Sequence, residues 1–100
     1  MLSRNAALEI ARQAIGGLSA GGGAVRIDEA ASYESELCFV FMWNSAAFFE
    51  SGKPEDQLFG NAPVIVSKLD GTLVDSGTAY PVEEYVRRYE RRRWRWWRRH

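Results

Sequence analysis

The side chains that most often carry out catalysis are nearly absent from this chain of 100 residues. His100 is the only histidine and Cys38 the only cysteine. Nothing would position an imidazole at the last residue, so a Ser/His/Asp or Cys/His catalytic arrangement cannot be assembled. Zinc sites need several cysteine or histidine ligands, and these two single residues do not supply them. We therefore expect no catalytic site, no metal site and no cofactor.

Two glycine-rich stretches, Gly16-Gly17 and Gly21–Gly23, are candidates for a phosphate-binding loop. Such a loop needs a preceding strand and a following Lys-Ser/Thr pair, and neither accompanies these glycines. A connection from a helix to a strand explains them better. Aspartate and glutamate could still form an acid–base pair, but no pair stands in a recognisable catalytic motif. The sequence thus predicts a binding protein, not an enzyme.

Charge is divided unevenly along the chain, although the formal net charge is zero. Residues 1–86 hold five basic and twelve acidic side chains, a net charge of −7. Residues 87–100 hold eight arginines and one acid, a net charge of +7. This asymmetry is typical of a tail with a task separate from that of the body. A hydrophobic content of 46% argues against intrinsic disorder of the body.

The densest group of acids surrounds a predicted hairpin and comprises Asp28, Glu29, Glu34 and Glu36. A negative surface attracts a basic partner at long range and raises its association rate more than its final affinity. The alternative is that these charges only keep a solvated sheet edge from aggregating. Both interpretations remain open from the sequence.

The C-terminal segment combines arginine with tryptophan, and its candidate surface residues are Arg91, Arg92, Arg93, Trp94, Arg95, Trp96, Trp97, Arg98 and Arg99. One use is contact with an anionic membrane surface. A second is binding of nucleic acid, with arginines on phosphates and tryptophans on unpaired bases. A third is docking on the acidic body or on a partner. An extension without any role is the remaining alternative.

Periodicity predicts a helix over residues 3–18, where apolar residues fall at helical spacing. The pair Gly16-Gly17 offers a C-terminal stop for this helix. After the glycine-rich loop, Val25 and Ile27 alternate with polar residues, as in a half-buried strand. A solvated hairpin turn is expected at residues 34–36.

Residues 37–43 form the longest apolar run and have no polar face. A strand of this kind is covered on both sides or lies at the centre of a sheet. Residues 46–50 either extend the strand past a bulge or make a short turn, and the sequence does not separate the two. Residues 52–56 have the composition of a surface loop.

Two further strands are expected at residues 64–69 and 72–75, joined by Asp70-Gly71 in a tight turn with positive φ at both central residues. A second helix follows, with a buried stripe of Val82, Tyr85, Val86 and Tyr89. The order α-β-β-β-β-α predicts an α+β fold. It consists of an N-terminal helix, a four-stranded antiparallel meander sheet and a C-terminal helix, with one face of the sheet packed by helix.

The composition also bears on the compartment. The apolar run at residues 37–43 is far shorter than the roughly 20 residues of a membrane span. Glu9 and Arg12 interrupt the segment that would have to be the apolar core of a signal peptide. One cysteine cannot form an internal disulfide. We therefore expect a cytoplasmic protein.

A series of short motifs occupies residues 39–90. They are F-V-F-M-W-N-S at 39–45, an aromatic pair and E-S-G at 48–52, G-N-A-P at 60–63, V-I-V-S-K-L-D-G at 64–71 and G-T-A-Y-P-V-E-E-Y at 77–85. Their order and spacing resemble the YrhB-like family, also called the immunity protein 35 domain, of bacterial polymorphic-toxin loci. The resemblance implies a domain over residues 1–90 and leaves residues 91–100 as a basic Arg/Trp-rich tail.

The resemblance implies a non-enzymatic immunity protein that binds and neutralises a cognate toxin. The alternative, from relatives described as heat-stable, is a small chaperone-like protein that holds unfolded clients. A lower alternative is a membrane- or nucleic-acid-binding accessory that acts through the tail. Phe39 stands where the family has a tryptophan, and Trp43 follows on the same strand face. Trp43 therefore joins the four acids as an expected partner-binding residue.

Overall fold

The computed structural model describes residues 1–18, 24–58 and 61–99. In these ranges the elements are α1 (Arg4–Leu18), β1 (Val25–Glu34), β2 (Cys38–Ser45), α2 (Ala46–Ser51), the 3₁₀ turn η1 (Pro54–Asp56), β3 (Val64–Ser67), β4 (Leu73–Val74) and α3 (Val82–Arg99). The strands form one antiparallel sheet in the order β1-β2-β3-β4. The predicted α+β meander with a helix at each end is confirmed. The predicted glycine-rich loop at Gly21–Gly23 lies outside the described residues.

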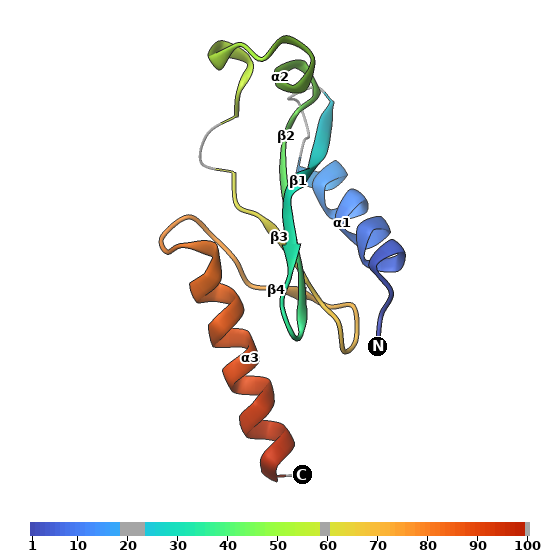
Figure 1. The fold of residues 1–100 in the computed structure, drawn as a ribbon, viewed down its shortest axis with the longest axis vertical. Helices are drawn as coiled ribbons and strands as arrows, with labels where there is room; N and C mark the ends of the chain where they lie inside the picture. The colour runs from blue at the N-terminus through green and yellow to red at the C-terminus, as the bar shows by residue number, and fades with distance from the viewer. Residues whose placement is uncertain (19–23, 59–60, 100) are drawn as a thin grey trace.

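The helices α1 and α3 cover opposite faces of the sheet (Figure 1). Side chains alternate along β2, so that Phe39, Phe41 and Trp43 pack against α1, while Cys38 and Val40 pack towards α3. The core therefore consists of two clusters, one on each face of the sheet. To the cluster on the α1 face, α1 contributes Ala7, Leu8, Ala11 and Ile15, and to the cluster on the α3 face, α3 contributes Val86 and Tyr89. The expectation of helix on one face only was wrong, because β2 is apolar on both faces and each face needs a cover.

Residues 46–50, which the sequence left between strand and turn, belong to the short helix α2. Ser45 is the last residue of β2 and also the N-cap of α2, since its hydroxyl accepts a hydrogen bond from the Phe48 N–H at 3.1 Å. The same hydroxyl donates to the Asp56 carbonyl at 2.5 Å. Gly52 ends α2 with a positive φ of 67°. One buried serine therefore redirects the chain from strand to helix.

The hairpin between β3 and β4 is confirmed, but its turn is not the expected tight one. The strands stop at Ser67 and resume at Leu73, and within this described loop only Gly71 has a positive φ, 75°. The Asp70 carboxylate accepts hydrogen bonds from the N–H and the hydroxyl of Thr72, at 3.0 and 2.7 Å. The side chain of Asp70 thus closes a longer loop, which removes the need for positive φ at this residue.

An extended bulge interrupts β1. Asp28 pairs with Met42 of β2 and Tyr33 pairs with Val40, so that residues 29–32 stand opposite a single residue of β2. Bulges bend an edge strand and make it a poor template for pairing with another chain. The alternation of Val25 and Ile27 predicted the strand, but nothing in that pattern indicated the bulge.

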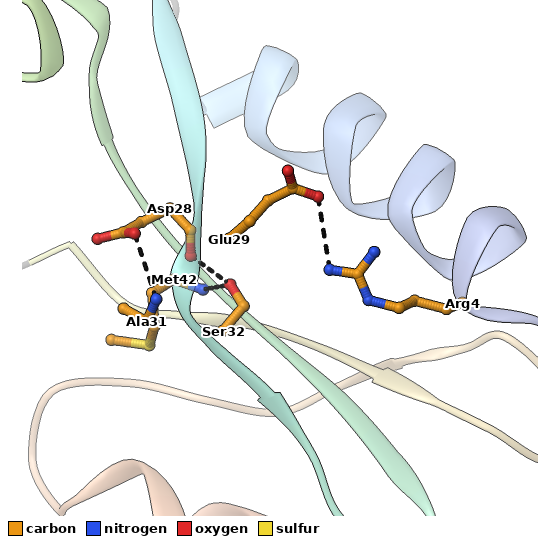
Figure 2. A network of polar contacts seen from close by, with 6 residues as sticks. All are labelled: Arg4, Asp28, Glu29, Ala31, Ser32 and Met42. Atoms are coloured by element: carbon orange, nitrogen blue, oxygen red, sulfur yellow. Dashed lines mark hydrogen bonds and ion pairs between the residues drawn. The ribbon is translucent and has the colours of Figure 1, made fainter.

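At the bulge, the Ser32 hydroxyl bridges the backbones of β1 and β2 in place of a direct hydrogen bond between them (Figure 2). It donates to the Asp28 carbonyl at 2.7 Å and accepts from the Met42 N–H at 3.0 Å. The Asp28 carboxylate accepts from the Ala31 N–H at 3.2 Å and holds the bulged backbone. Two side chains therefore satisfy backbone groups that a regular strand pair would have joined directly.

Replacing Ser32 with alanine is expected to lower the free energy of unfolding by about 1–3 kcal/mol. The Met42 N–H and the Asp28 carbonyl would lose the hydroxyl that they share. Urea unfolding followed by tryptophan fluorescence measures the loss. Thr78→Ala is the matched control, because Thr78 is exposed and its hydroxyl makes none of the described hydrogen bonds; its effect should stay within about 0.5 kcal/mol. Equal effects of the two substitutions would contradict the role assigned to Ser32.

Candidate functional site

The one cysteine is unsuited to nucleophilic chemistry. Cys38 is fully buried under α3. Burial raises the pKa of its thiol to about 11, and the nearby Glu90 carboxylate adds to the increase. A protonated, enclosed thiol is a poor nucleophile. Among the described residues, no group of three or more His, Cys, Asp or Glu side chains is placed to hold a metal ion.

The raised pKa of Cys38 predicts a loss of stability at alkaline pH. In the unfolded chain the thiol ionises near pH 9, whereas in the folded chain it keeps its proton to about pH 11. The contribution of the neutral thiol is therefore complete below pH 9 and declines above it, by about 1.4 kcal/mol per pH unit. Urea unfolding of the wild type and of Cys38→Ala from pH 8 to 11 measures this. Parallel pH profiles of the two proteins would contradict the assignment.

The four acids expected to bind a partner lie on β1 or on the turn after it, but they do not share one surface. Asp28 and Glu29 point to opposite sides of β1 (Figure 2). Glu29 lies 3.4 Å from the Arg4 guanidinium of α1, whereas Asp28 is turned towards the bulge backbone. Neighbouring residues of a strand face opposite ways, so the fold separates two acids that are adjacent in sequence.

Glu34 lies on the α1 side of the sheet, as Glu29 does. It pairs across the strands with Phe39, and its carboxylate is 2.6 Å from the Lys68 ammonium. That ammonium also lies 5.0 Å from the centre of the Phe39 ring. The Lys68 side chain is only 14% exposed, while that of Glu34 is 60% exposed. Glu34 therefore still presents an acidic surface to solvent, and Glu36 is exposed in the adjoining turn.

A pocket of about 230 Å³ opens on this side of β1, next to the bulge, and we call it the β1 pocket. Its lining residues are Arg4, Ser32, Tyr33, Glu34, Phe39 and Phe41. The two phenylalanine rings are stacked, with centroids 6.4 Å apart and an interplanar angle of 21°. The two rings belong to the core, at 6% and 2% exposed, and form the floor of the pocket, while its rim carries one acidic and one basic side chain. A cationic side chain at the rim can reach the exposed Glu34 carboxylate.

Trp43 lies on the same face of β2 as Phe39, as the sequence predicted, but it is a core residue. Its side chain is 9% exposed, and its indole N–H donates to the Ala62 carbonyl at 2.7 Å. The Asn61 side chain in turn donates to the Trp43 carbonyl at 2.6 Å. This burial removes Trp43 from the surface that a partner could touch. Phe39, on the same face of β2, lines the β1 pocket.

The C-terminal arginines extend α3, which continues without a break from Val82 to Arg99. Arg93 lies 3.9 Å from the Asp70 carboxylate and 5.8 Å from the centre of the Tyr89 ring, so one tail residue does contact the body. Arg91, Arg92 and Arg95 are exposed. Within the described residues, no helix is both long and apolar enough for a membrane span.

Comparisons with known proteins place the chain in a family. The family model for immunity protein 35 matches residues 5–91. The chain is also similar to the uncharacterized protein YrhB of Escherichia coli (strain K12), with 40% identity over 52 residues, which are 52% of this chain and 55% of that protein. The chain thus spans about half the length of this curated relative. No solved structure matches. Because the family model extends over all four strands and over the parts of α1 and α3 that cover them, the chain belongs to the immunity protein 35 family.

Proposed function

We propose that this protein neutralises a cognate bacterial toxin by direct contact and performs no chemistry of its own. Membership of the immunity protein 35 family supports the immunity role. The observation that carries the proposal further is the β1 pocket, which has an exposed carboxylate, that of Glu34, at its rim. The protein acts in the cytoplasm, where its single cysteine stays a thiol.

A toxin with a basic surface fits this side of the molecule. The net charge of −7 on residues 1–86 attracts such a partner at long range. At contact, an arginine of the toxin would bind the solvent-exposed side of the Glu34 carboxylate, while Lys68, whose side chain is 14% exposed, keeps its contact with Glu34. The stem of that arginine would lie along the rim of the β1 pocket, beside the exposed backbone and side chains of β1.

The bulge favours contact through side chains over addition of a strand to the sheet. A partner strand would have to follow the outer edge of β1, and residues 29–32 break the regular ladder there. Two residues of the same bulge lie on this side of the sheet: Glu29 contacts Arg4 of α1, and Ser32 lines the β1 pocket. The irregularity that protects the edge therefore also shapes the proposed contact surface.

The double substitution Glu29→Gln and Glu34→Gln tests the pocket. It is expected to reduce the association rate with the toxin about tenfold at low salt, because two carboxylates next to the contact lose their charge. The protein encoded by the neighbouring gene is the first candidate toxin to use, and stopped-flow fluorescence with the purified proteins measures the rate. The control Glu55→Gln with Asp75→Asn changes the net charge equally at two exposed residues of other loops. Equal losses in both variants would show that only overall charge matters and would contradict a docking role of the pocket.

The chaperone-like alternative predicts a different behaviour in the same preparation. An immunity protein saturates at a fixed stoichiometry with one toxin and protects cells that express it. A holding protein suppresses the heat aggregation of unrelated proteins without a fixed stoichiometry. Suppression of aggregation without protection in a co-expression assay would replace the immunity function with the chaperone-like one.

A further inference from the structure

The outward side of α3 carries a row of arginines. Arg91, Arg92 and Arg95 fall within about 100° of one another around the helix axis, at 100° per residue. All three are exposed. Val86 lies on the opposite side of the helix and is buried against the sheet, as is Tyr89. The arginine row therefore points away from the body of the protein.

Glu84 forms ion pairs with the first two arginines of α3, which precede this row. Glu84 binds Arg87 at 2.8 Å and Arg88 at 3.0 Å. Arg91, Arg92 and Arg95 take part in none of the ion pairs formed within residues 1–18, 24–58 and 61–99. Because these three arginines follow closely on one helix, they form a concentrated positive surface.

The packing of α3 favours nucleic acid over a membrane as the occupant of this surface. A helix that lies in a membrane interface inserts its apolar side into the lipid. The apolar side of α3 is already occupied by the sheet at Val86 and Tyr89. Trp94 is 40% exposed and is a neighbour of Arg91 on the helix surface, three residues away. Cations beside an exposed aromatic ring are the combination with which proteins hold unpaired nucleotides.

We propose that the outward face of α3 binds single-stranded nucleic acid without sequence preference. Arg91, Arg92 and Arg95 contact phosphates, and Trp94 stacks on a base. The face lies on the other side of the sheet from the β1 pocket (Figure 1), so both contacts can exist at the same time. The inference does not depend on the proposed toxin contact.

Fluorescence anisotropy of a labelled single strand of about 20 nucleotides, with the full-length protein, tests the proposal. Three phosphate contacts give a slope of about −2 in log affinity against log salt concentration. Arg91→Gln/Arg92→Gln/Arg95→Gln should therefore weaken binding about 100-fold at 0.1 M salt and reduce the slope by about 2. Arg4→Gln/Arg12→Gln/Arg26→Gln is the matched control, since it removes three exposed arginines outside α3.

Trp94→Ala should weaken single-strand binding at least fivefold and leave the helix content unchanged by circular dichroism. The triple α3 variant should still protect cells from the toxin, which separates this inference from the proposed function. The proposal is overturned if the wild type does not bind the single strand, or if the control triple variant loses as much affinity as the α3 variant. It is also overturned if a duplex of the same length binds as tightly, or if phosphatidylglycerol vesicles are bound and the oligonucleotide is not.

Discussion

Replacing Trp43 with alanine is expected to lower the free energy of unfolding by about 3–5 kcal/mol. The indole is buried between α1 and the sheet, so its removal leaves a cavity in the core. The Ala62 carbonyl also loses the N–H that it accepts at 2.7 Å. Urea unfolding followed by circular dichroism measures the change without relying on tryptophan emission.

Two further variants separate the core role of Trp43 from a contact role. Trp43→Phe keeps an aromatic ring but loses the donor to the Ala62 carbonyl, and an intermediate loss of stability is expected. Trp94→Ala removes a half-exposed tryptophan of the tail and should change stability by no more than about 0.5 kcal/mol. A stable Trp43→Ala protein that no longer binds the toxin would assign Trp43 to the interface and contradict its place in the core.

Replacing Glu90 with alanine is expected to lower the free energy of unfolding by about 2–3 kcal/mol. The Glu90 carboxylate accepts hydrogen bonds from the Leu37 N–H at 2.7 Å and from the Ser35 hydroxyl at 3.0 Å. It therefore fastens α3 to the turn between β1 and β2. Without it, the N–H of Leu37, a buried residue, has no acceptor, and an unsatisfied buried donor is destabilising.

Glu90→Gln is the matched control, because the amide oxygen can still accept both hydrogen bonds. Neutral acceptors form weaker bonds than a carboxylate, so the expected loss is about 1 kcal/mol. Hydrogen exchange at the Leu37 amide reports the contact locally and should accelerate most in Glu90→Ala. Equal destabilisation by the two substitutions would mean that the charge of Glu90 matters and its hydrogen bonds do not.

Local patterns were sufficient for α1, the four strands and α3, but not for α2. The helical spacing of apolar residues predicted α1, and the unbroken apolar run at residues 37–43 predicted β2 and its central place in the sheet. Both patterns arise because a helix or strand must direct its apolar side chains towards another element of the core. The prediction that a helix packs on only one face of the sheet was wrong, because β2 and β3 are buried on both sides.

The irregular parts could not be predicted, because they depend on hydrogen bonds specific to this fold. The bulge of β1 is held by Ser32 and Asp28 through backbone groups that only the register with β2 brings near. The cap of α2 needs Ser45 to end a strand and to reach the Asp56 carbonyl. Serine and aspartate are common in loops of every kind, so their presence in the sequence does not reveal which of them will cap a helix or hold a bulge.

By itself, the sequence determined the order of α1, the four strands and α3, the resemblance to a family and the opposed charges of residues 1–86 and 87–100. These properties belong to single residues or to neighbours along the chain. Only the tertiary structure placed Glu29 and Glu34 on one side of β1 and Asp28 on the other, buried Trp43, and turned Arg91, Arg92 and Arg95 to solvent. Each of these depends on which elements pack together, and Arg4 and Glu29, 25 residues apart, meet only because α1 lies on that face of the sheet.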